Sequence, residues 1–405
     1  MKNSGHKIRI RFVSTAILMM LVVINQKNVI AKTPPKKTIV TATATGSWTT
    51  EEHPAHLDFS HLAKPLPYTN GTYADKGMPN PYVAKAPTNE WAKLPEGAYW
   101  ASIVGVSADS KGDVYVLHRC FGDNCYERPE PSILVFDGEG DFLRSFGAGL
   151  FVRPHGLWID GKDNVWAADV ETRGHVGFQI HKFDRKGNLL ESMGRKGYSA
   201  KTGLDYFVEP NHVITSAEGD IFVAEGHNDL GWPAVQNADK PYTKAASPHR
   251  ILRLDSAGRF KNIIGGPGSV PGKFNVPHAI AFDSKGRLFV ADRGNSSIQI
   301  FEQDGTFVAE WKQFGRPSTI HIDKNDKLYV TDIDSSRNNN LGFRYGIWVG
   351  DAATGERCAF IPSTINEPGG PEALWVDDHG DIYAGSVFRT LTRYFKDDVT
   401  KFACN

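Results

Sequence analysis

The chain has 405 residues, enough for one large domain or two ordinary ones, and its 40% hydrophobic content supports a substantial core. Its 46 Lys and Arg residues balance 46 Asp and Glu residues, so the formal net charge is zero. Such a protein has no global field that attracts nucleic acid or an anionic membrane. We therefore expect no nucleic-acid partner, and instead a small-molecule or short-peptide substrate. We also expect a monomer.

The first 31 residues predict a signal peptide. Basic residues, Arg9 and Arg11 among them, precede an apolar run at 12–24 that is too short to span a bilayer comfortably. Small and aliphatic residues leading to Ala31 fit cleavage there. We expect an exported protein, periplasmic or secreted, with no membrane span after cleavage. The alternative is an uncleaved anchor, which also places the folded part outside the cytoplasm.

The chain has four cysteines, which in an exported protein suggest disulfides. We predict that Cys120 pairs with Cys125 across a short loop, and that Cys358 pairs with Cys404 near the C-terminus. Free thiols are the alternative.

Residues 32–95 are rich in Thr, Pro, Lys and Asn and show little apolar periodicity, so they predict a linker followed by an irregular lead-in. From residue 96 to residue 405 the sequence changes to short β-type runs separated by Gly and Asp.

A unit with a recurring first and second strand repeats along this second part. First strands open at Val104, His155, Asn211, His278, Ser318 and Glu372, roughly 40 to 67 residues apart. Each is followed by a polar turn and a second run of β-branched and aromatic residues, as in 288–291. A third run and a Gly-containing turn complete several copies.

Six copies of a four-stranded unit predict an all-β fold, a six-bladed β-propeller, in which each sheet packs against its neighbours. The last copy lacks a clear fourth strand. We therefore predict that the ring is closed by an N-terminal strand, in the segment before Val104 that contains Tyr99 and Trp100.

The position that opens each first strand differs between copies, and this variation predicts function. In a six-bladed ring the second, fourth and sixth copies lie a third of a turn apart, so His155, His278 and Glu372 would converge on the axis. Two imidazoles and a carboxylate are a ligand set used by zinc and by non-haem iron. We predict a divalent transition metal here, zinc first and iron second; unrelated polar residues in a wet channel are the alternative.

A second variable position follows the second strand. Arg119, His227 and Arg293 are predicted to surround the channel mouth, where the arginines would hold a carboxylate or an oxyanion and His227 would act as a general base. For the arginines, salt bridges to neighbouring acids such as Asp292 or Asp169 are the alternative. The remaining polar residues at these positions are predicted to contact substrate: Asn211, Ser318 and Asp169.

The connection at 228–248 is much longer than its counterparts in the other copies. Long connections on one face often form lids or binding walls. A plain surface excursion is equally compatible with the sequence.

These residues bring the chain close to a known family. Pro154-His-Gly-Leu157, Pro277-His-Ala-Ile280 with Val290-Ala-Asp-Arg293, and Val116-Leu-His-Arg119 resemble the lyase domain of peptidylglycine α-amidating enzymes, the peptidyl-α-hydroxyglycine α-amidating lyases. The resemblance runs from about residue 90 to the C-terminus and includes 91–97, the lead-in of bacterial exported relatives. It implies a six-bladed propeller of NHL-type repeats, a channel zinc held by three histidines, two arginines beside the substrate, and cleavage of a carbinolamide C–N bond to a peptide amide and glyoxylate.

The chain matches this family at His155, His278, Arg119 and Arg293 but departs from it elsewhere. The third histidine falls on Glu372, and the family's catalytic tyrosine falls on His227. Ala373 replaces the aspartate that helps to hold a structural calcium, which argues against calcium in this protein. Glu372 would lower the positive charge at the metal, so we expect weak or absent glyoxylate release from an α-hydroxyglycine peptide.

The sequence as a whole predicts an exported metal-dependent lyase or hydrolase that acts on a small carbinolamide, lactone or carbonyl compound. The alternative is a non-catalytic propeller that binds a ligand or a protein through its channel.

Overall fold

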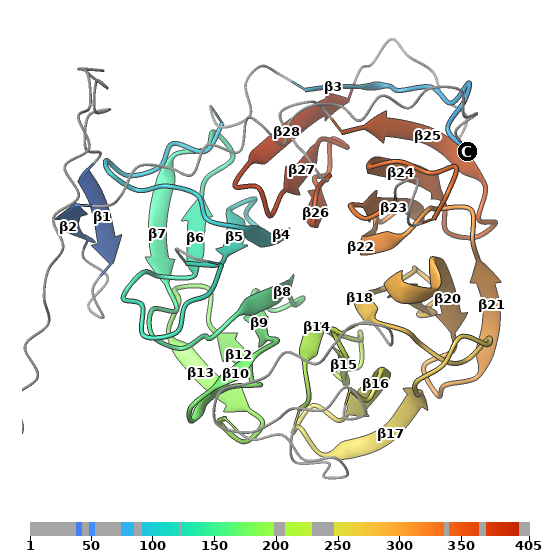
Figure 1. Cartoon of the computed structure of the whole chain (residues 1–405), viewed down its shortest axis with the longest axis horizontal. Coiled ribbons are helices and arrows are strands. Elements are labelled where there is room, and N and C mark those ends of the chain that lie inside the picture. Colours follow the sequence, from blue (N-terminus) through green and yellow to red (C-terminus); the bar gives the residue numbers. More distant parts are fainter. Residues whose placement is uncertain are drawn as a thin grey trace, which may run out of the picture. The chain divides into compact units, whose positions relative to one another are not determined.

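A computed structural model describes residues 74–84, 91–120, 123–197, 207–228, 247–335, 340–363 and 370–396, together with the backbone of 38–42 and 48–52. Within these residues, six four-stranded antiparallel sheets stand around a central axis (Figure 1). The all-β six-bladed propeller predicted from the repeats is thus confirmed. The predicted signal peptide at 1–31 lies outside the described residues and stays a prediction.

The sheets follow one another along the chain, and each runs from the axis outward. The first sheet contains β4 (Ile103–Ala108), β5 (Val114–His118), β6 (Ile133–Phe136) and β7 (Phe142–Phe146). The second contains β8 (Pro154–Ile159), β9 (Val165–Asp169), β12 (Ile180–Phe183) and β13 (Leu189–Met193). The third contains β14 (Pro210–Thr215), β15 (Ile221–Glu225), β16 (Arg250–Leu254) and β17 (Phe260–Gly265).

The remaining sheets keep the same order. The fourth contains β18 (Pro277–Phe282), β19 (Leu288–Asp292), β20 (Ser297–Phe301) and β21 (Phe307–Trp311). The fifth contains β22 (Pro317–Ile322), β23 (Lys327–Asp332), β24 (Gly346–Asp351) and β25 (Arg357–Pro362). The sixth contains β26 (Ala373–Val376), β27 (Ile382–Gly385), β28 (Leu391–Lys396) and β3 (Tyr82–Ala84).

The outermost strand of the sixth sheet comes from the N-terminal part of the chain. It is β3, whose residues 82–84 pair antiparallel with β28, and not the segment around Tyr99 and Trp100 that the sequence analysis indicated. Trp100 instead lies in the core between the sixth and first sheets, where its ring is 5.8 Å from that of Phe136. The large buried ring serves this interface, whereas 82–84 lies in the segment predicted to be an irregular lead-in.

Other short elements lie outside the blades. In the predicted linker, β1 (Thr38–Ala42) and β2 (Trp48–Glu52) pair as an antiparallel hairpin, consistent with the β-branched residues of β1. β10 (Thr172–Arg173) pairs with β11 (Val176–Gly177), and η3 (Arg293–Asn295) is a 3-10 turn after β19. Among the residues described, no helix is long and apolar enough to cross a membrane.

Hydrophobic clusters fill the spaces between neighbouring sheets. Each of six clusters combines residues of two adjacent sheets, and one of them joins the sixth sheet to the first. Large side chains such as Trp348 and Phe289 are completely buried in them. Each sheet therefore buries both faces, which explains why its inner strands are apolar without a clean alternation.

The aspartates that end the first strands stabilise the turns that follow. Oδ1 of Asp109 accepts the backbone N–H groups of Lys111 and Asp113. The same pattern recurs at Asp160, Asp283, Asp323 and Asp377. These Asx turns explain why an aspartate recurs at the end of the first strand in most copies.

Candidate metal centre and active site

The innermost strands share a backbone irregularity at the position that was predicted to face the channel. The β8–β9 register shifts between Pro154 and Leu157, and the β18–β19 register shifts between Pro277 and Ala279. Equivalent shifts occur at the start of β4, β14 and β22. A β-bulge re-aims the side chain beside it. His155 and His278 lie within these bulges, which explains how a strand of the sheet can direct an imidazole toward the axis.

His155 and His278 meet at the axis, as predicted. Their rings are 4.5 Å apart, and both side chains are almost completely buried. Nδ1 of His155 lies 3.0 Å from the carbonyl oxygen of Asn211, and Nδ1 of His278 lies 2.8 Å from that of Ser318. A carbonyl only accepts, so each Nδ1 carries the proton and each Nε2 presents its lone pair to the channel.

Glu372, immediately before β26, completes the predicted trio. Its Oε1 lies 3.3 Å from Nε2 of His278 and 3.6 Å from Nε2 of His155. The hydroxyl of Ser318 donates to Oε2 at 3.0 Å. Burial would raise the pKa of Glu372, but His278, His155 and Arg293 outweigh it and lower the pKa well below its usual range. The carboxylate is therefore ionised and faces both imidazoles.

The two imidazoles are suited to bind a metal ion. Burial, with the charge of His278 next, lowers the pKa of His155 well below its usual value, and burial also lowers the pKa of His278. In both rings burial thus favours the neutral form, which is the form that ligates metals. Their Nε2 atoms are buried and have no hydrogen-bond partner. Buried polar atoms are rarely left unpaired, so a cation between these nitrogens and Glu372 fits the residues present.

His227, which follows β15, lies beside the same group. Its ring is 4.8 Å from that of His155 and 5.6 Å from that of His278. One nitrogen of each of the three imidazoles falls within a group 4.8 Å across, so His227 can supply either a third metal-binding nitrogen or the predicted proton transfer. Its backbone N–H donates to Oε2 of Glu209 at 2.7 Å, and this bond fixes the start of the connection.

The predicted arginines lie at the mouth of the channel. Nε of Arg119 donates to the carbonyl oxygen of Pro154 at 3.2 Å, and Nη1 donates to Asp123 at 3.0 Å. Nε of Arg293 is buried without a hydrogen bond and lies 3.8 Å from Asp334. The predicted alternative partner of Arg293, Asp292, instead accepts hydrogen bonds from other groups, among them the Asn275 backbone N–H. Both guanidinium groups therefore keep N–H donors for a ligand.

Asn211, Ser318 and Asp169 lie behind the site, a placement that differs from their predicted contact with substrate. All three are completely buried. Asn211 and Ser318 orient the histidines through their carbonyl groups. Asp169 accepts the backbone N–H groups of Val152 and Arg153, and burial raises its pKa to about 7. The Asn211 side chain donates to the carbonyl oxygens of Gly226 and Pro277, and the Ser318 hydroxyl donates to Glu372, so these residues support the candidate ligands.

Sequence reasoning missed two further arginines. Arg153 donates to Asp123 at 2.9 Å, and Nε of Arg316 donates to Asp334 at 3.3 Å. Each directly precedes the proline that opens an inner strand, a position that reads Glu209 and Val276 in the third and fourth copies. This difference between copies could have marked Arg153 and Arg316 as candidate site residues.

A cavity of about 510 Å³ extends along the axis from His155 and His278. Trp158, Phe282 and Trp375 are among its lining residues. Its volume lies within the range of small-molecule sites. The predicted lid at 228–248 falls mostly outside the described residues.

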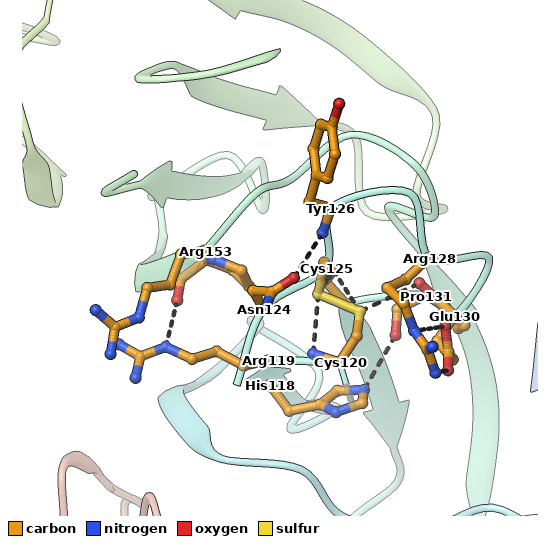
Figure 2. The surroundings of a disulfide bond; sticks show 12 residues. His118, Arg119, Cys120, Asn124, Cys125, Tyr126, Arg128, Glu130, Pro131 and Arg153 are labelled. Atoms are coloured by element: carbon orange, nitrogen blue, oxygen red, sulfur yellow. Dashed lines mark hydrogen bonds and ion pairs between the residues drawn. A yellow bond between two sulfur atoms is a disulfide. The ribbon is translucent and has the colours of Figure 1, made fainter. Parts of the chain in front are cut away.

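Cys120 and Cys125 form the predicted disulfide next to Arg119 (Figure 2). The bridge anchors the segment that carries both Arg119 and Asp123. Cys358 is buried on β25, and its predicted partner Cys404 lies outside the described residues.

Comparison with known proteins agrees with this architecture. The NHL repeat pattern matches residues 274–301. NHL repeat-containing protein 3 of Homo sapiens is 31% identical over 258 residues, which cover 61% of this chain and 66% of that protein. A probable peptidyl-α-hydroxyglycine α-amidating lyase of Caenorhabditis elegans is 29% identical over 188 residues, covering 45% of this chain and 47% of that protein. The chain thus spans less than two thirds of the length of these relatives.

One solved structure, a gluconolactonase of Xanthomonas campestris, superimposes with a TM-score of 0.50 and 16% identity, covering 81% of this chain and 98% of that chain. At this identity the similarity concerns the fold. The chain is thus a six-bladed propeller that contains an NHL repeat and is similar in sequence to amidating lyases, in agreement with the resemblance.

Proposed function

We propose that this NHL-repeat propeller is a metal-dependent enzyme that cleaves a C–N or C–O bond of a small anionic carbinolamide, lactone or carbonyl compound. The observation that carries the proposal is the pair of buried, unpaired Nε2 atoms of His155 and His278 beside the ionised Glu372. Their Nδ1 atoms are held by carbonyl groups, an arrangement typical of metal-ligating histidines.

His155, His278 and Glu372 would hold the metal, with zinc expected before iron, and His227 would stay free to move a proton. When bound, such an ion supplies a Lewis acid that lowers the pKa of a substrate hydroxyl or of water. Arg119 and Arg293 would orient an anionic group of the substrate through charge-assisted hydrogen bonds. Burial of the imidazoles keeps competing water away from the reacting atoms.

For a carbinolamide the proton balance is simple. His227 would accept the hydroxyl proton, the O–H electrons would form the new carbonyl, and the C–N bond would break with its electrons on nitrogen. The same imidazolium would then return the proton to the leaving amide nitrogen. Burial, followed by the charge of His155, lowers the pKa of His227 well below its usual value, so it begins as a neutral base.

Metal analysis of the purified protein tests the proposal first. We expect one equivalent of transition metal, lost in the Glu372→Ala variant together with turnover. The absence of stoichiometric metal, combined with an unchanged Glu372→Ala variant, would instead identify a non-catalytic binding propeller. A His227→Ala variant that retains metal but not turnover would assign His227 to proton transfer.

A substrate panel tests the reaction. Glyoxylate release from an α-hydroxyglycine peptide and hydrolysis of a small lactone separate lyase from hydrolase activity. The carboxylate in place of the third histidine reduces the positive charge at the metal, so we expect slow glyoxylate release from a simple peptide substrate. Rapid release would show that Glu372 does not impair the metal.

We also propose that the protein is exported. The basic and apolar residues at the N-terminus support this, and so does the disulfide between Cys120 and Cys125. Cell fractionation of the full chain tests it: cytoplasmic protein with an intact N-terminus would contradict export.

A further inference from the structure

We propose that Glu209 is a positioning residue for His227: its buried carboxylate holds the backbone of His227, so that the imidazole stays beside His155 and His278. Glu209 precedes β14 and His227 follows β15, and because these strands pair antiparallel, both residues lie at the same end of the third sheet. The proposal rests on the proposed function for the role of His227 in proton transfer, but not for the place that Glu209 gives to the ring.

The carboxylate of Glu209 binds donors on both sides of the long connection that follows His227. Glu209 is 3% exposed. Its Oε2 accepts the backbone N–H groups of His227 at 2.7 Å and of Asn228 at 3.3 Å, and the hydroxyl of Ser247 donates to the same oxygen at 2.8 Å. Oε1 accepts a hydrogen bond from the side-chain amide of Asn228. Hydrogen bonds to a carboxylate are stronger than those between neutral groups, so this acid fixes the backbone of His227 firmly.

The residue before His227 is held as well. Gly226 donates its N–H to the carbonyl oxygen of Glu209 at 2.9 Å, and its own carbonyl accepts the side-chain amide of Asn211 at 2.9 Å. Gly226 has a φ of 107°, and a Cβ at this position would lie 2.8 Å from the backbone nitrogen of His249. Glu209 therefore binds two consecutive amides, and the backbone that leads into His227 has little freedom.

Glu209 itself has a strained backbone. Its φ is 52°, in the left-handed region, which costs free energy for a residue with a Cβ. Such a conformation persists where the surrounding contacts outweigh the strain, and it is concentrated at functional sites. The bonds from His227, Asn228 and Ser247 to the carboxylate are contacts of this kind.

The equivalent position carries the opposite charge in two other copies. Arg153 in the second copy and Arg316 in the fifth each donate to an aspartate. A guanidinium group has no acceptor, whereas a carboxylate accepts several backbone N–H groups. The acid in the third copy is thus suited to hold the main chain of His227.

The position of the His227 backbone decides where its ring lies. His227 comes after the end of β15 (Ile221–Glu225), so the pairing of that strand does not extend to it. Its ring centre is 4.8 Å from that of His155 and 5.6 Å from that of His278. Displacement of a reacting group by about 1 Å can lower a rate about 100-fold. Weaker contacts at Glu209 should therefore change both the environment of the ring and turnover.

NMR of the purified protein with ¹⁵N-labelled histidine tests the position of the ring without any substrate. A His227→Gln variant identifies the signal of His227. Glu209→Gln keeps the size of the side chain but replaces one acceptor oxygen by an NH₂ group, so we expect the ring signal to shift or to divide into two. The control is Asp220→Asn, which changes a buried carboxylate at the opposite end of β15 that binds Arg253 and Lys261. A His227 signal at its wild-type position in folded Glu209→Gln protein would overturn the proposal.

A milder variant covers the case in which Glu209→Gln does not fold. Ser247→Ala removes one donor to Oε2 and leaves the charge of Glu209 in place. We expect a measurable shift of the His227 signal that Asp220→Asn does not produce. Identical His227 signals in Ser247→Ala and in the wild type would then overturn the proposal.

Turnover distinguishes a positioning role from a purely structural one. On a compound of the substrate panel that is cleaved, Glu209→Gln should lower kcat about tenfold and change KM about twofold or less, with full metal content. Glu209→Asp keeps the charge but is one methylene shorter, and it should retain more of kcat. Asp220→Asn should leave kcat within about twofold, even where it lowers the stability of the fold. Equal losses of kcat in Glu209→Gln and Asp220→Asn would show that Glu209 serves the fold alone.

This proposal and the proposed reaction fail in different ways. A displaced His227 signal in Glu209→Gln, without cleavage of any compound of the panel, would refute the reaction and leave intact the inference that Glu209 places the ring. Cleavage with an unchanged kcat in Glu209→Gln would leave the reaction intact and refute the positioning role.

Discussion

The inner strands of the second, fourth and sixth sheets differ from those of the first, third and fifth at the same point of the repeat. The former present His155, His278 and Glu372 to the axis. The latter present Asn211 and Ser318, whose carbonyl groups hold the two histidines, and the apolar Val104. One backbone position thus supplies either a candidate ligand or the group that orients it, depending on the sheet.

This division has an energetic consequence. Orientation of the histidines comes mainly from backbone carbonyl groups, which survive any side-chain substitution. Changes in the ligand-bearing sheets should therefore affect metal binding more strongly than changes in the supporting sheets. Substitutions in the two sets of sheets test this difference in metal affinity.

The largest effect is expected for His155→Ala. The substitution removes one nitrogen of the candidate centre, so metal affinity should fall at least about 100-fold. Competition with a chromophoric chelator measures it. His181→Gln is the matched control, since His181 is also buried but lies on β12, away from the axis. Full metal content in the His155 variant would show that the imidazole is not a ligand.

A smaller loss is expected for Glu372→Gln. The shape and the hydrogen bond from Ser318 remain while the negative charge disappears, so affinity should fall about 30-fold. Glu372→His should retain the metal, because it supplies another neutral ligand. Chelator competition on the two variants compares them, and an unchanged affinity in the Gln variant would place the carboxylate outside the coordination sphere.

A substitution in a supporting sheet should lower metal affinity less. Ser318→Ala removes the hydroxyl that donates to Glu372 but keeps the carbonyl that holds His278, so we expect a loss of about tenfold or less. Ser297→Ala is the control, since its hydroxyl is buried without a partner on β20. A loss as large as that of His155→Ala would end the contrast between the two sets of sheets.

His181 is buried outside the candidate metal centre, so its substitution tests the effect of burial on stability alone. Burial lowers the pKa of His181 from 6.5 to about 4, so the folded protein binds fewer protons than the unfolded chain between these values. The corresponding stability is present above pH 6.5 and is lost as the pH falls toward 4, a change of about 3 kcal/mol. His181→Gln should flatten the pH dependence of chemical denaturation by that amount and leave metal binding unchanged. An identical pH profile would contradict it.

Alignment of the repeat copies predicted some features of the fold and of the candidate site but not others. The copies align because each strand and turn is specified locally, by β-branched runs and by aspartates that cap turns. This alignment predicted the number of sheets and the convergence of His155 and His278. It did not predict which residue at a variable position is a support, because that depends on carbonyl directions set by bulges.

Hydrophobic periodicity and turn residues act over a few positions, so the repeat, the ring and the residues that open each inner strand follow from the sequence. That β3, and not the segment at Tyr99, completes the sixth sheet depends on contacts between distant parts of the chain. Such contacts also pair Arg119 with Arg153 and Arg293 with Arg316 around shared carboxylates, and place Asn211 and Ser318 behind the histidines. These relations join residues from different sheets, and their distances arise when hydrophobic packing closes the ring.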